Sequence, residues 1–443
     1  MCVCSQYDDA INWIHDRLKF GVKPGLKRME WLLNKLDHPE RNIPTIHVAG
    51  TNGKGSTISY MLHILMEAGY KVGTFTSPYI ETFNERISVN GQPITDDEMI
   101  SLVNEVKPFA EKIENTDLGS PTEFEIITTM MFLYFGKVNK PDFLLLETGL
   151  GGRLDSTNVI DPILSVITNI GYDHMNILGD TITDIAREKA GIIKKGRPIF
   201  TAAEKKEALE VLVQTAKEKN APYYSFGKDI SVKNLSPWEH GEKFSVKTKT
   251  NTYEDAKIKM RGNHQIKNAA LAISVIDYLK EQGAVKITYD EVVEGIKKSI
   301  WKGRFELIHQ NPVVIVDGAH NDEGIESLID TIKRHYPHTR IHILFSALSD
   351  KNYKKMIDRL STVATTMHFT TFDFPRAARA EDLYSACELD KKTFSMSWQG
   401  LLNELLVSNE NKKNDLIIVT GSLYFISSIR NYLLKKDSGN KNT

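Results

Sequence analysis

Hydrophobic positions along the chain form short apolar runs that alternate with stretches of helical spacing. A β-branched apolar run begins at Ile46 and is followed by helical spacing over residues 57–69. Residues 71–78 return to a strand pattern. The runs at 141–150 and 162–171 are continuously apolar, as strands covered on both faces should be. This rhythm predicts a mostly parallel sheet of the α/β class.

The chain also carries signals for a helix start and for a change of sheet type. Thr95 and Glu98 have the spacing of a capping box, which predicts a helix that begins there. Between about residues 229 and 261 the sequence becomes polar and alternating, which indicates a small antiparallel ribbon. Helical spacing then resumes at 264–282 and 289–299.

A second alternation of strands and helices begins after residues 300–304. It includes an apolar strand that ends in the motif DGAH and a helix expected over residues 322–335. We therefore predict an N-terminal domain over residues 1–299, a linker over 300–304, a C-terminal α/β domain over 305–435 and a disordered tail over 436–443.

The composition narrows the class of protein. The 443 residues are too many for one ordinary core, and 56 Lys and Arg residues balance 57 Asp and Glu residues, which argues against a nucleic-acid or membrane-surface partner. The N-terminus lacks a secretion signal and no run of about eighteen apolar residues occurs, so we expect a cytoplasmic protein. Cys2, Cys4 and Cys387 are too few for a zinc site or a disulfide framework.

The segment GTNGKGS, between the first strand and the first helix, has the composition of a phosphate-binding loop. Its glycines let the backbone approach phosphate oxygens, so that N–H groups and the positive end of the helix face the anion. Lys54 is placed to reach the terminal phosphates, and Ser56 or Thr57 to hold a metal. The three glycines are Gly50, Gly53 and Gly55.

The loop departs from the strict pattern GxxxxGK[ST]. Val48 stands where the first glycine belongs, and Gly55 separates Lys54 from Ser56. A glycine-rich turn between a strand and a helix, with an exposed lysine, is therefore an alternative interpretation.

Four more candidates in the first domain lie outside this loop. Ser77 follows the second strand and lies beside the phosphate loop if the first two strands are neighbours. Glu147 lies at the end of a buried strand, a position that suits a metal ligand or a supporting carboxylate. His174 follows the next strand, where a structural histidine is the alternative. Lys189 by its spacing alone indicates a solvated helix lysine.

The second domain carries a further set of charged residues. Asp317 and His320 follow a strand directly, and Arg304 stands at the predicted boundary. An arginine over a phosphate site neutralises charge that develops during phosphoryl transfer. Each of the three also has a plain alternative as a surface ion pair or a loop residue.

The motifs of the chain resemble one known family. GTNGKGS, SPYIETFNERI, ETGLGGRLDSTN, YDHMNILG, EKAGIIK, HQIKNAALAI, WKGRFE and DGAHN occur in that order. Together they are similar to folylpolyglutamate synthase and dihydrofolate synthase, of the Mur-ligase superfamily, over roughly residues 21–426. The resemblance implies ATP-dependent joining of L-glutamate to a folate through an acyl phosphate. We expect a P-loop ATPase-like N-terminal domain and a Rossmann-like C-terminal domain.

The resemblance also implies roles for single residues. It implies that the ATP phosphates are bound by Gly53, Lys54, Gly55 and Ser56. It implies contacts to adenine, phosphate and ribose from Asn268, Arg304 and Asp317, with His320 close by. It implies two Mg²⁺ sites, one at Ser77 and Glu147 and the other at His174. Lys189 resembles the family's carbamylated lysine, which carries an anionic group close to the metals.

For the folate and glutamate the resemblance gives a further set. Arg28 lies in FGVKPGLKRM, which resembles the loop near the pterin, and three other residues resemble the dihydropteroate-binding set: Thr122, Asp155 and Ser156. Arg376 is a hypothesis for binding the carboxylates of the incoming glutamate, because an arginine fork matches a carboxylate. One departure is Asp322, where many relatives carry proline.

Two other functions stay open. A UDP-muramoyl-type amino-acid ligase shares the ATP chemistry, but the resemblance implies that it needs a substrate domain ahead of the phosphate loop, where 49 residues precede Gly50. A regulatory NTPase without ligase activity turns over ATP with no added amino acid. For the ligase we expect a monomer that binds folate or dihydropteroate, L-glutamate and ATP, and whose two domains close on them.

Overall fold

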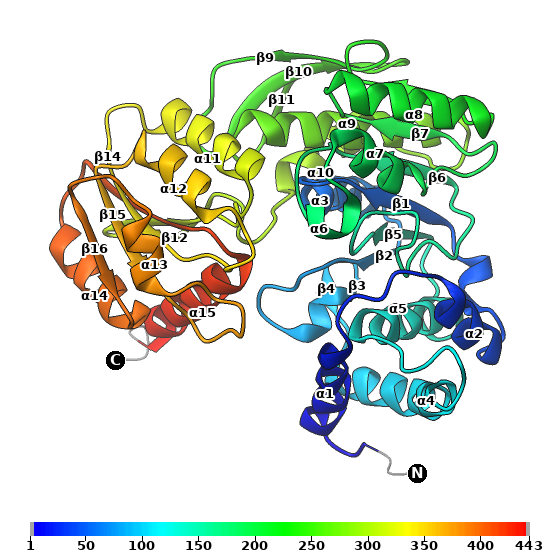
Figure 1. Cartoon of the computed structure of the whole chain (residues 1–443). Coiled ribbons are helices and arrows are strands. Elements are labelled where there is room, and N and C mark those ends of the chain that lie inside the picture. Colours follow the sequence, from blue (N-terminus) through cyan, green and yellow to red (C-terminus); the bar gives the residue numbers. More distant parts are fainter. Residues whose placement is uncertain (1–3, 440–443) are drawn as a thin grey trace. The chain divides into compact units, whose positions relative to one another are not determined.

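The chain, described over residues 4–439 by a computed structural model, forms two compact units (Figure 1). Unit 1 contains the described residues up to Lys233, Ser245–Ala256 and Lys267–Ser299. Unit 2 contains Asn234–Phe244, Lys257–Ile266 and the described residues from Ile300 onward. Two segments from the predicted N-terminal domain thus lie in unit 2. The domain boundaries themselves stay predictions.

Unit 1 is built on an eight-stranded sheet with the order β4-β3-β2-β5-β1-β6-β7-β8. Its strands are β1 Thr45–Ala49, β2 Val72–Phe75, β3 Ile87–Val89, β4 Gln92–Pro93, β5 Phe143–Glu147, β6 Leu164–Ile167, β7 Ile199–Thr201 and β8 Tyr223–Ser225. Only the β2–β3 and β3–β4 pairs are antiparallel. The predicted mostly parallel sheet is confirmed.

The order of the strands corrects one expectation. β1 pairs with β5 and β6, whereas β2 pairs with β5, so the first two strands are not neighbours. β5 is buried at all five positions and lies between them. Its continuous apolar sequence suits this interior place in a parallel sheet better than an edge.

The helices of unit 1 connect these strands. They are α1 Tyr7–His15, α2 Lys27–Lys35, α3 Lys54–Glu67, α4 Asp96–Glu114, α5 Glu123–Leu133, α6 Met175–Leu178, α7 Ile182–Ala190, α8 Lys206–Glu218 and α10 Tyr289–Lys298. Short 3-10 turns are Asp16–Phe20, Pro39–Asn42 and Phe83–Arg86, and Tyr134–Val138 is a π-helical turn. The capping box predicted at Thr95 and Glu98 opens α4.

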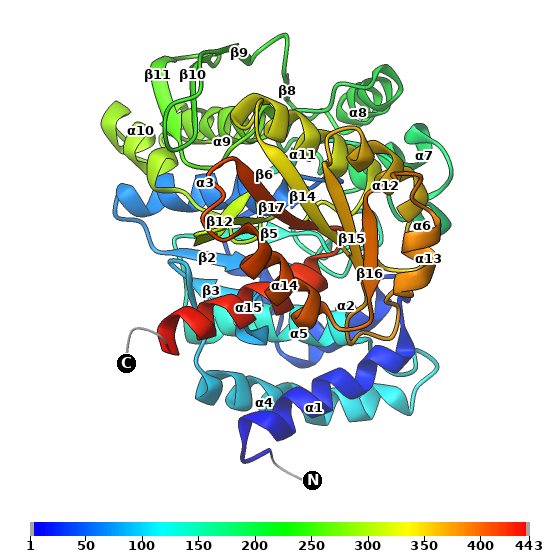
Figure 2. The same ribbon diagram turned by 90° about the vertical axis from the view of Figure 1, so that its left-hand side faces the viewer.

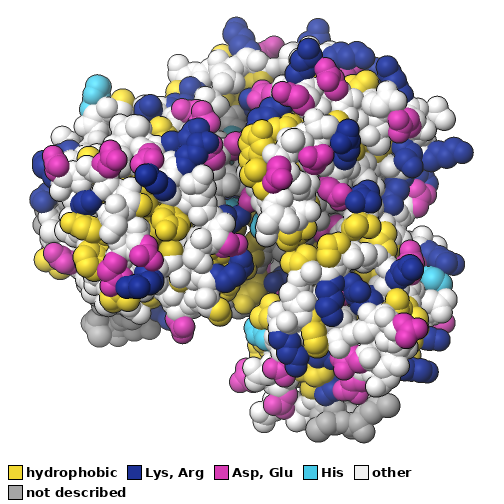
Figure 3. Space-filling view, viewed as in Figure 1, with side chains coloured by type: hydrophobic (Ala, Val, Ile, Leu, Met, Phe, Trp, Pro, Cys, Tyr) yellow, Lys and Arg dark blue, Asp and Glu magenta, His cyan; other side chains and the backbone are white. Residues whose placement is uncertain are grey.

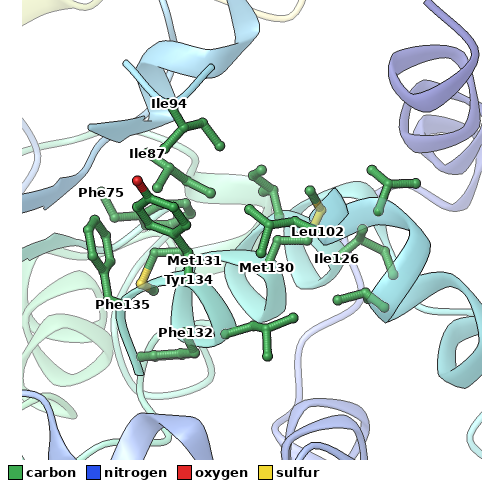
Figure 4. Close-up of a cluster of buried hydrophobic side chains, with 14 of the residues drawn as sticks. Phe75, Ile87, Ile94, Leu102, Ile126, Met130, Met131, Phe132, Tyr134 and Phe135 are labelled. Atoms are coloured by element: carbon green, nitrogen blue, oxygen red, sulfur yellow. The ribbon is translucent and has the colours of Figure 1, made fainter. Parts of the chain in front are cut away.

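One hydrophobic core of unit 1 lies where α4 and α5 pack together beside the sheet (Figure 4). Phe75 from β2 and Ile87 from β3 meet Met130 and Met131 from α5, all fully buried. Burying a side chain of this size contributes roughly 1.5–3 kcal/mol. This core supports the edge of the sheet at which β2 and β5 end.

The predicted antiparallel ribbon is present. Its strands are β9 Ser231–Asn234, β10 Glu242–Lys247 and β11 Thr252–Ile258, in the order β11-β10-β9. After the ribbon, α9 runs over Asn263–Glu281, close to the predicted 264–282. The chain passes from one unit to the other within the ribbon and again near the start of α9.

Unit 2 holds a six-stranded sheet in the order β12-β13-β17-β14-β15-β16. The strands are β12 Glu306–Gln310, β13 Val313–Val316, β14 Arg340–Phe345, β15 Thr366–Thr370, β16 Lys392–Ser395 and β17 Asp415–Thr420. All pairs are parallel except β12–β13 (Figure 2 shows β14, β15 and β16 side by side). Two cores of buried apolar side chains accompany this sheet. The predicted second α/β domain has this architecture.

The helices of unit 2 are α11 Asp322–His335, α12 Tyr353–Ser361, α13 Ala380–Ser385, α14 Trp398–Asn409 and α15 Leu423–Gly439. The predicted bounds of α11 match the structure. The predicted disordered tail is wrong for residues 436–439, where α15 continues. Lys436 in the last turn suits the negative end of a helix. Residues 440–443 lie outside the described part, as does Cys2.

Charged side chains of both signs are interspersed on the face seen in Figure 3, as the near-zero net charge leads one to expect.

Cys4 and Cys387 are buried and have free thiols. Within residues 4–439, no helix is both long and apolar enough to cross a bilayer.

Candidate functional site

The loop after β1 turns sharply at two glycines before α3 begins. Gly50 has φ 153° and Gly53 has φ 84°, a left-handed conformation that favours glycine. A Cβ on Gly53 would lie 2.5 Å from Oδ1 of Asn268, and a Cβ on Gly50 would overlap the hydroxyl of Thr168. The turn therefore needs glycine for space as well as for conformation. It also brings the predicted residue Asn268 against the loop.

Two lysines converge on one carbonyl of this loop. Nζ of Lys54, at the start of α3, donates to the carbonyl oxygen of Gly50 at 3.2 Å. Nζ of Lys189, on α7, donates to the same oxygen at 3.0 Å. A single carbonyl oxygen thus faces two ammonium groups, so the loop concentrates positive charge where a phosphate is expected.

Lys189 is not a solvated helix lysine. Its exposed fraction is 4%, and burial together with the charge of Lys54 lowers its pKa from 10.5 to about 7. Asp173 and Asp155 act in the opposite direction but more weakly. The expectation drawn from spacing alone is wrong, because the side chain that spacing places on a helix surface points into unit 1.

Glu147 connects Lys54 with Ser77. One carboxylate oxygen of Glu147, at the end of β5, lies 3.7 Å from Nζ of Lys54. The other accepts a hydrogen bond from the backbone N–H of Ser77 at 3.2 Å. Ser77 approaches because β2 and β5 are parallel neighbours that end at the same edge. The structure therefore brings Ser77 and Glu147 together, and their role at a metal stays a prediction.

These residues fit a magnesium ion. Mg²⁺ prefers oxygen ligands and is commonly held by one or two carboxylates together with substrate phosphates and water. Glu147 is 4% exposed, and its carboxylate faces the loop that carries Lys54. Among residues 4–439, no three His, Cys, Asp or Glu side chains are grouped as a site built from protein ligands alone would require. A buried carboxylate beside a candidate phosphate loop is a ligand of the kind that such an ion takes.

His174 lies on an exposed turn. It has φ 50° and precedes α6, and its side chain is 43% exposed with Nε2 3.9 Å from a carboxylate oxygen of Asp173. The backbone N–H of His174 donates to Asp173 at 2.9 Å. The ring is thus accessible for a ligand, and its predicted role at a second metal stays a prediction.

Arg28 and Thr122 are brought together by Glu125. Nε of Arg28 lies 2.9 and 3.0 Å from the two carboxylate oxygens of Glu125, which is 1% exposed. Glu125 in turn forms a capping box with Thr122 at the start of α5. A second arginine N–H group donates to the carbonyl oxygen of Lys23 at 2.8 Å. The arginine thereby ties the N-terminal loop to α5.

Asp155 stabilises its own loop. One carboxylate oxygen accepts from the N–H of Leu150 at 2.7 Å, and the other accepts from the N–H and hydroxyl of Thr157 at 3.0 and 2.5 Å. Burial raises the pKa of Asp155 while these bonds lower it. Ser156 lies between Asp155 and Thr157 and is partly buried. Internal hydrogen bonds therefore hold the conformation of the loop GGRLDSTN.

In unit 2, three predicted residues surround Gly318. The carboxylate of Asp317 accepts from the N–H groups of Phe305 and Ala319, both at 2.9 Å. Burial raises the pKa of Asp317, and the charge of Arg304 opposes that shift. Nδ1 of His320 lies 2.8 Å from the carbonyl oxygen of Gly318. A Cβ on Gly318 would overlap the guanidinium of Arg304.

Arg376 forms an ion pair within unit 2. Its guanidinium donates to Asp350 at 2.8 Å, with the arginine side chain 52% exposed. The pair is on the surface of unit 2, where such an ion pair contributes roughly 0–1 kcal/mol. Asp322, the departure noted in the sequence, pairs with Lys355 and Arg359, each at 2.7 Å.

Sequence reasoning missed the residues that hold the phosphate loop. Thr168 and Asn169, directly after β6, bond to the backbone of Thr51 and Asn52. The available signal was their place at the exit of a continuously apolar strand. Because the strand order was not known, that signal did not connect them with the first strand.

Comparison with known proteins matches two family domains along the chain. The Mur ligase middle domain matches residues 48–276, and the Mur ligase glutamate ligase domain matches residues 303–423. The dihydrofolate synthase/folylpolyglutamate synthase of Bacillus subtilis is 52% identical over 429 residues, which cover 96% of this chain and 99% of that protein. The chain belongs to the Mur ligase family, among the dihydrofolate synthase/folylpolyglutamate synthases.

Solved structures of this family share the fold. Mycobacterium tuberculosis folylpolyglutamate synthase complexed with ADP and AMPPCP is 27% identical with a TM-score of 0.89, covering 96% of this chain and 99% of that chain. Escherichia coli FolC in complex with DHPP and ADP is 26% identical with a TM-score of 0.87, covering 99% and 100%. The resemblance drawn from the motifs and the predicted fold class are confirmed.

Proposed function

We propose that this Mur ligase family member uses ATP to add L-glutamate to a folate, and also to dihydropteroate, through an acyl phosphate. The observation that carries this proposal is the approach of Lys54 and Lys189 to the Gly50 carbonyl, with the carboxylate of Glu147 beside Lys54. It stands in a chain that is 52% identical to a dihydrofolate synthase/folylpolyglutamate synthase along nearly its whole length.

The residues of unit 1 suit the first chemical step. A folate carboxylate and a triphosphate repel each other, so their reaction needs positive charge at the meeting point. We propose that Lys54 turns from the Gly50 carbonyl to the phosphates, while the N–H groups of Gly53 to Ser56 and the amino end of α3 bind oxygens. Mg²⁺, when bound by Ser77 and Glu147, supplies further neutralisation, with His174 at a second ion.

The carboxylate oxygen of the folate then attacks the γ-phosphorus, and the bond to the β,γ-bridging oxygen breaks to release ADP. The glutamate amine attacks the acyl carbon, loses a proton and displaces inorganic phosphate. Neither step requires an oxidant. The arrangement of charge in unit 1 serves the first step, which forms the acyl phosphate.

We propose that Lys189 carries a carbamate in the active enzyme. Its amine is buried, and at a pKa of about 7 a large share of the group is neutral at neutral pH. The neutral amine attacks CO₂, a nitrogen–carbon bond forms and a proton leaves, which replaces an ammonium by an anion. The charge of Lys54 favours that exchange, because repulsion between two ammonium groups gives way to attraction between an ammonium group and an anion.

The remaining assignments rest on position in the family motifs. We propose that the pterin-bearing substrate contacts the loops held by Arg28, Thr122, Asp155 and Ser156. For unit 2 we propose that Asp317 contacts the ribose, Arg304 a phosphate and Arg376 the incoming glutamate, with His320 close to the reacting groups and Asn268 of unit 1 at the adenine. Domain closure, a monomer and a cytoplasmic location stay predictions. Domain closure is checked by small-angle scattering, in which AMPPCP, Mg²⁺ and folate should make the protein more compact.

The proposed function is tested by ADP release. The purified chain is incubated with dihydropteroate or with tetrahydrofolate, each with and without L-glutamate, and with Mg²⁺ present or chelated. We expect ADP release that needs the pterin substrate, glutamate and Mg²⁺, with one glutamate added for each ADP formed. Release that ignores both substrates would support a regulatory NTPase instead, and activity with a muramoyl substrate alone would support the other ligase.

A further inference from the structure

The loop that follows β1 runs beside the loop that follows β6. The two strands are parallel neighbours, with Ala49 opposite Ile167 in register. Residues 50–52 and residues 168–171 therefore leave the sheet at the same edge and on adjacent paths. This adjacency joins parts of the chain that are more than a hundred residues apart.

Asn169 bonds to two consecutive N–H groups of the phosphate loop. Its backbone carbonyl oxygen accepts from the N–H of Thr51 at 3.0 Å. Its side-chain Oδ1 accepts from the N–H of Asn52 at 2.7 Å. These donors precede the left-handed residue Gly53 directly. Asn169 thus fixes the backbone of the two residues that precede the turn at Gly53.

Neighbouring bonds reinforce the same path. The hydroxyl of Thr168 donates to the carbonyl oxygen of Asn52 at 2.6 Å. The hydroxyl of Thr51 lies 3.2 Å from the carbonyl oxygen of Gly171 and accepts from its N–H at 3.0 Å. The loop is therefore anchored on one side before α3 begins. The first N–H groups of a helix have no acceptor within the helix and suit an anion.

We infer that Asn169 is a positioning residue for nucleotide binding, which holds the phosphate loop in its binding conformation through the N–H of Asn52. The inference rests on the proposed function. Without this bond, the loop must be ordered at the moment of binding, and that cost appears in the affinity for nucleotide. Asn169 does not need to touch the nucleotide for this effect.

The neutral amide suits this place better than a carboxylate. An aspartate keeps an oxygen acceptor for Asn52 but adds negative charge beside a loop that is expected to bind a triphosphate. Asn169→Ala therefore tests the hydrogen bond, and Asn169→Asp tests the charge. Salt screens the repulsion between the carboxylate introduced by Asn169→Asp and the nucleotide phosphates, since the Debye length is about 10 Å at 0.1 M salt and shorter at higher salt. The effect of the substitution should therefore weaken as ionic strength rises.

A matched control is available in the same unit. The side chain of Asn104, on α4, also bonds to the backbone of a distant segment: Oδ1 accepts from the N–H of Cys4 at 2.8 Å, and Nδ2 donates to its carbonyl oxygen at 2.9 Å. Asn104 and Asn169 are both partly buried. Asn104→Ala therefore removes two hydrogen bonds of the same kind away from the phosphate loop.

The test measures Kd for AMPPCP by calorimetry, and KM for ATP and for glutamate by ADP release. For Asn169→Ala we expect Kd and KM for ATP to rise about tenfold, as the loss of one backbone-anchoring bond predicts, with KM for glutamate changed less than twofold. For Asn169→Asp we expect a larger rise that shrinks at high salt. Asn104→Ala should leave all three constants within twofold of the parent.

The inference is overturned if Asn169→Ala binds AMPPCP as the parent does, or if Asn104→Ala changes the constants equally. If Asn169→Ala does not fold, Thr51→Val removes a milder anchor of the same loop and should raise KM for ATP severalfold, and an unchanged KM again overturns the inference. A parent chain that neither binds AMPPCP nor forms glutamylated product contradicts the proposed function itself.

Discussion

In unit 1 the loop after β1 gathers positive charge, whereas in unit 2 the loop after β13 buries a negative charge. Lys54 and Lys189 both donate to the carbonyl oxygen of Gly50. Asp317, directly after β13, accepts from two backbone N–H groups and lies in the field of Arg304. Both loops follow parallel strands at their carboxyl ends, the edge at which α/β proteins bind ligands.

The difference shows how one architecture serves two kinds of ligand. The ammonium group of Lys54 and the amino end of a helix favour an anion such as a polyphosphate. A buried carboxylate with backbone partners favours a donor, such as a hydroxyl or an amine, at its remaining lone pairs. The strands place each loop, and the residues within it decide the sign of the charge. The contrast makes distinct predictions for the two units.

The largest effect is expected for Lys54→Ala. Removing the cation that the loop directs to phosphate should lower kcat/KM for ATP more than a hundredfold, about 3 kcal/mol of transition-state stabilisation. Steady-state ADP release measures the effect. Lys195→Ala, which removes an exposed lysine, is the control and should change the rate less than twofold. A decrease in kcat/KM of less than tenfold for Lys54→Ala would contradict the role assigned to this residue.

Lys189→Met should lower the activity and also change how the free energy of unfolding depends on pH. We expect a loss of at least tenfold in kcat. The folded amine has a pKa of about 7 and the unfolded one about 10.5, so between these values the unfolded chain binds more protons. The free energy of unfolding of the parent should therefore rise from pH 7 to pH 9 more than that of Lys189→Met.

Urea unfolding at pH 7, 8 and 9 checks this difference. Lys189→Arg, which keeps a permanent charge in the same buried place, should be less stable than the parent at every pH. Parallel pH profiles for the parent and Lys189→Met would show that Lys189 is not buried as described.

Asp317→Asn should have a smaller, ligand-specific effect. The amide keeps one oxygen acceptor but loses the charge, so we expect KM for ATP to rise about tenfold. If Asp317 accepts from a ribose hydroxyl, the parent should discriminate against 2′-deoxy-ATP or 3′-deoxy-ATP, and the variant should lose that discrimination. Equal discrimination by both proteins, measured as ratios of kcat/KM, would contradict a ribose contact.

The smallest effect is expected for Asp322→Pro. The substitution removes two surface ion pairs, with Lys355 and Arg359, but places proline at the first position of α11, where it is well tolerated. We expect the free energy of unfolding to change by less than about 1 kcal/mol and KM for ATP to stay within twofold. A large kinetic change would mean that the start of α11 also shapes the Asp317 loop.

Some residues of the candidate site could be predicted from the sequence, and others could not. The phosphate loop, Glu147 and Asp317 were singled out from local motifs at strand ends, because the carboxyl ends of strands in an α/β sheet are where ligands bind. The burial of Lys189 did not follow from its helix, since a lysine among lysines has the local pattern of a solvated residue. Asn169 gave no motif at all, because its importance comes from a neighbouring strand.

The sequence by itself determined the α/β class, most strands and helices of both units, the capping box at Thr95 and the bounds of α11, because these follow from local periodicity and capping. Only the tertiary structure decided that β5 separates β1 from β2, that Lys189 points inward and that Asn169 anchors the phosphate loop. These features depend on contacts between residues far apart in the chain, and strand order is set by how whole layers bury their apolar faces.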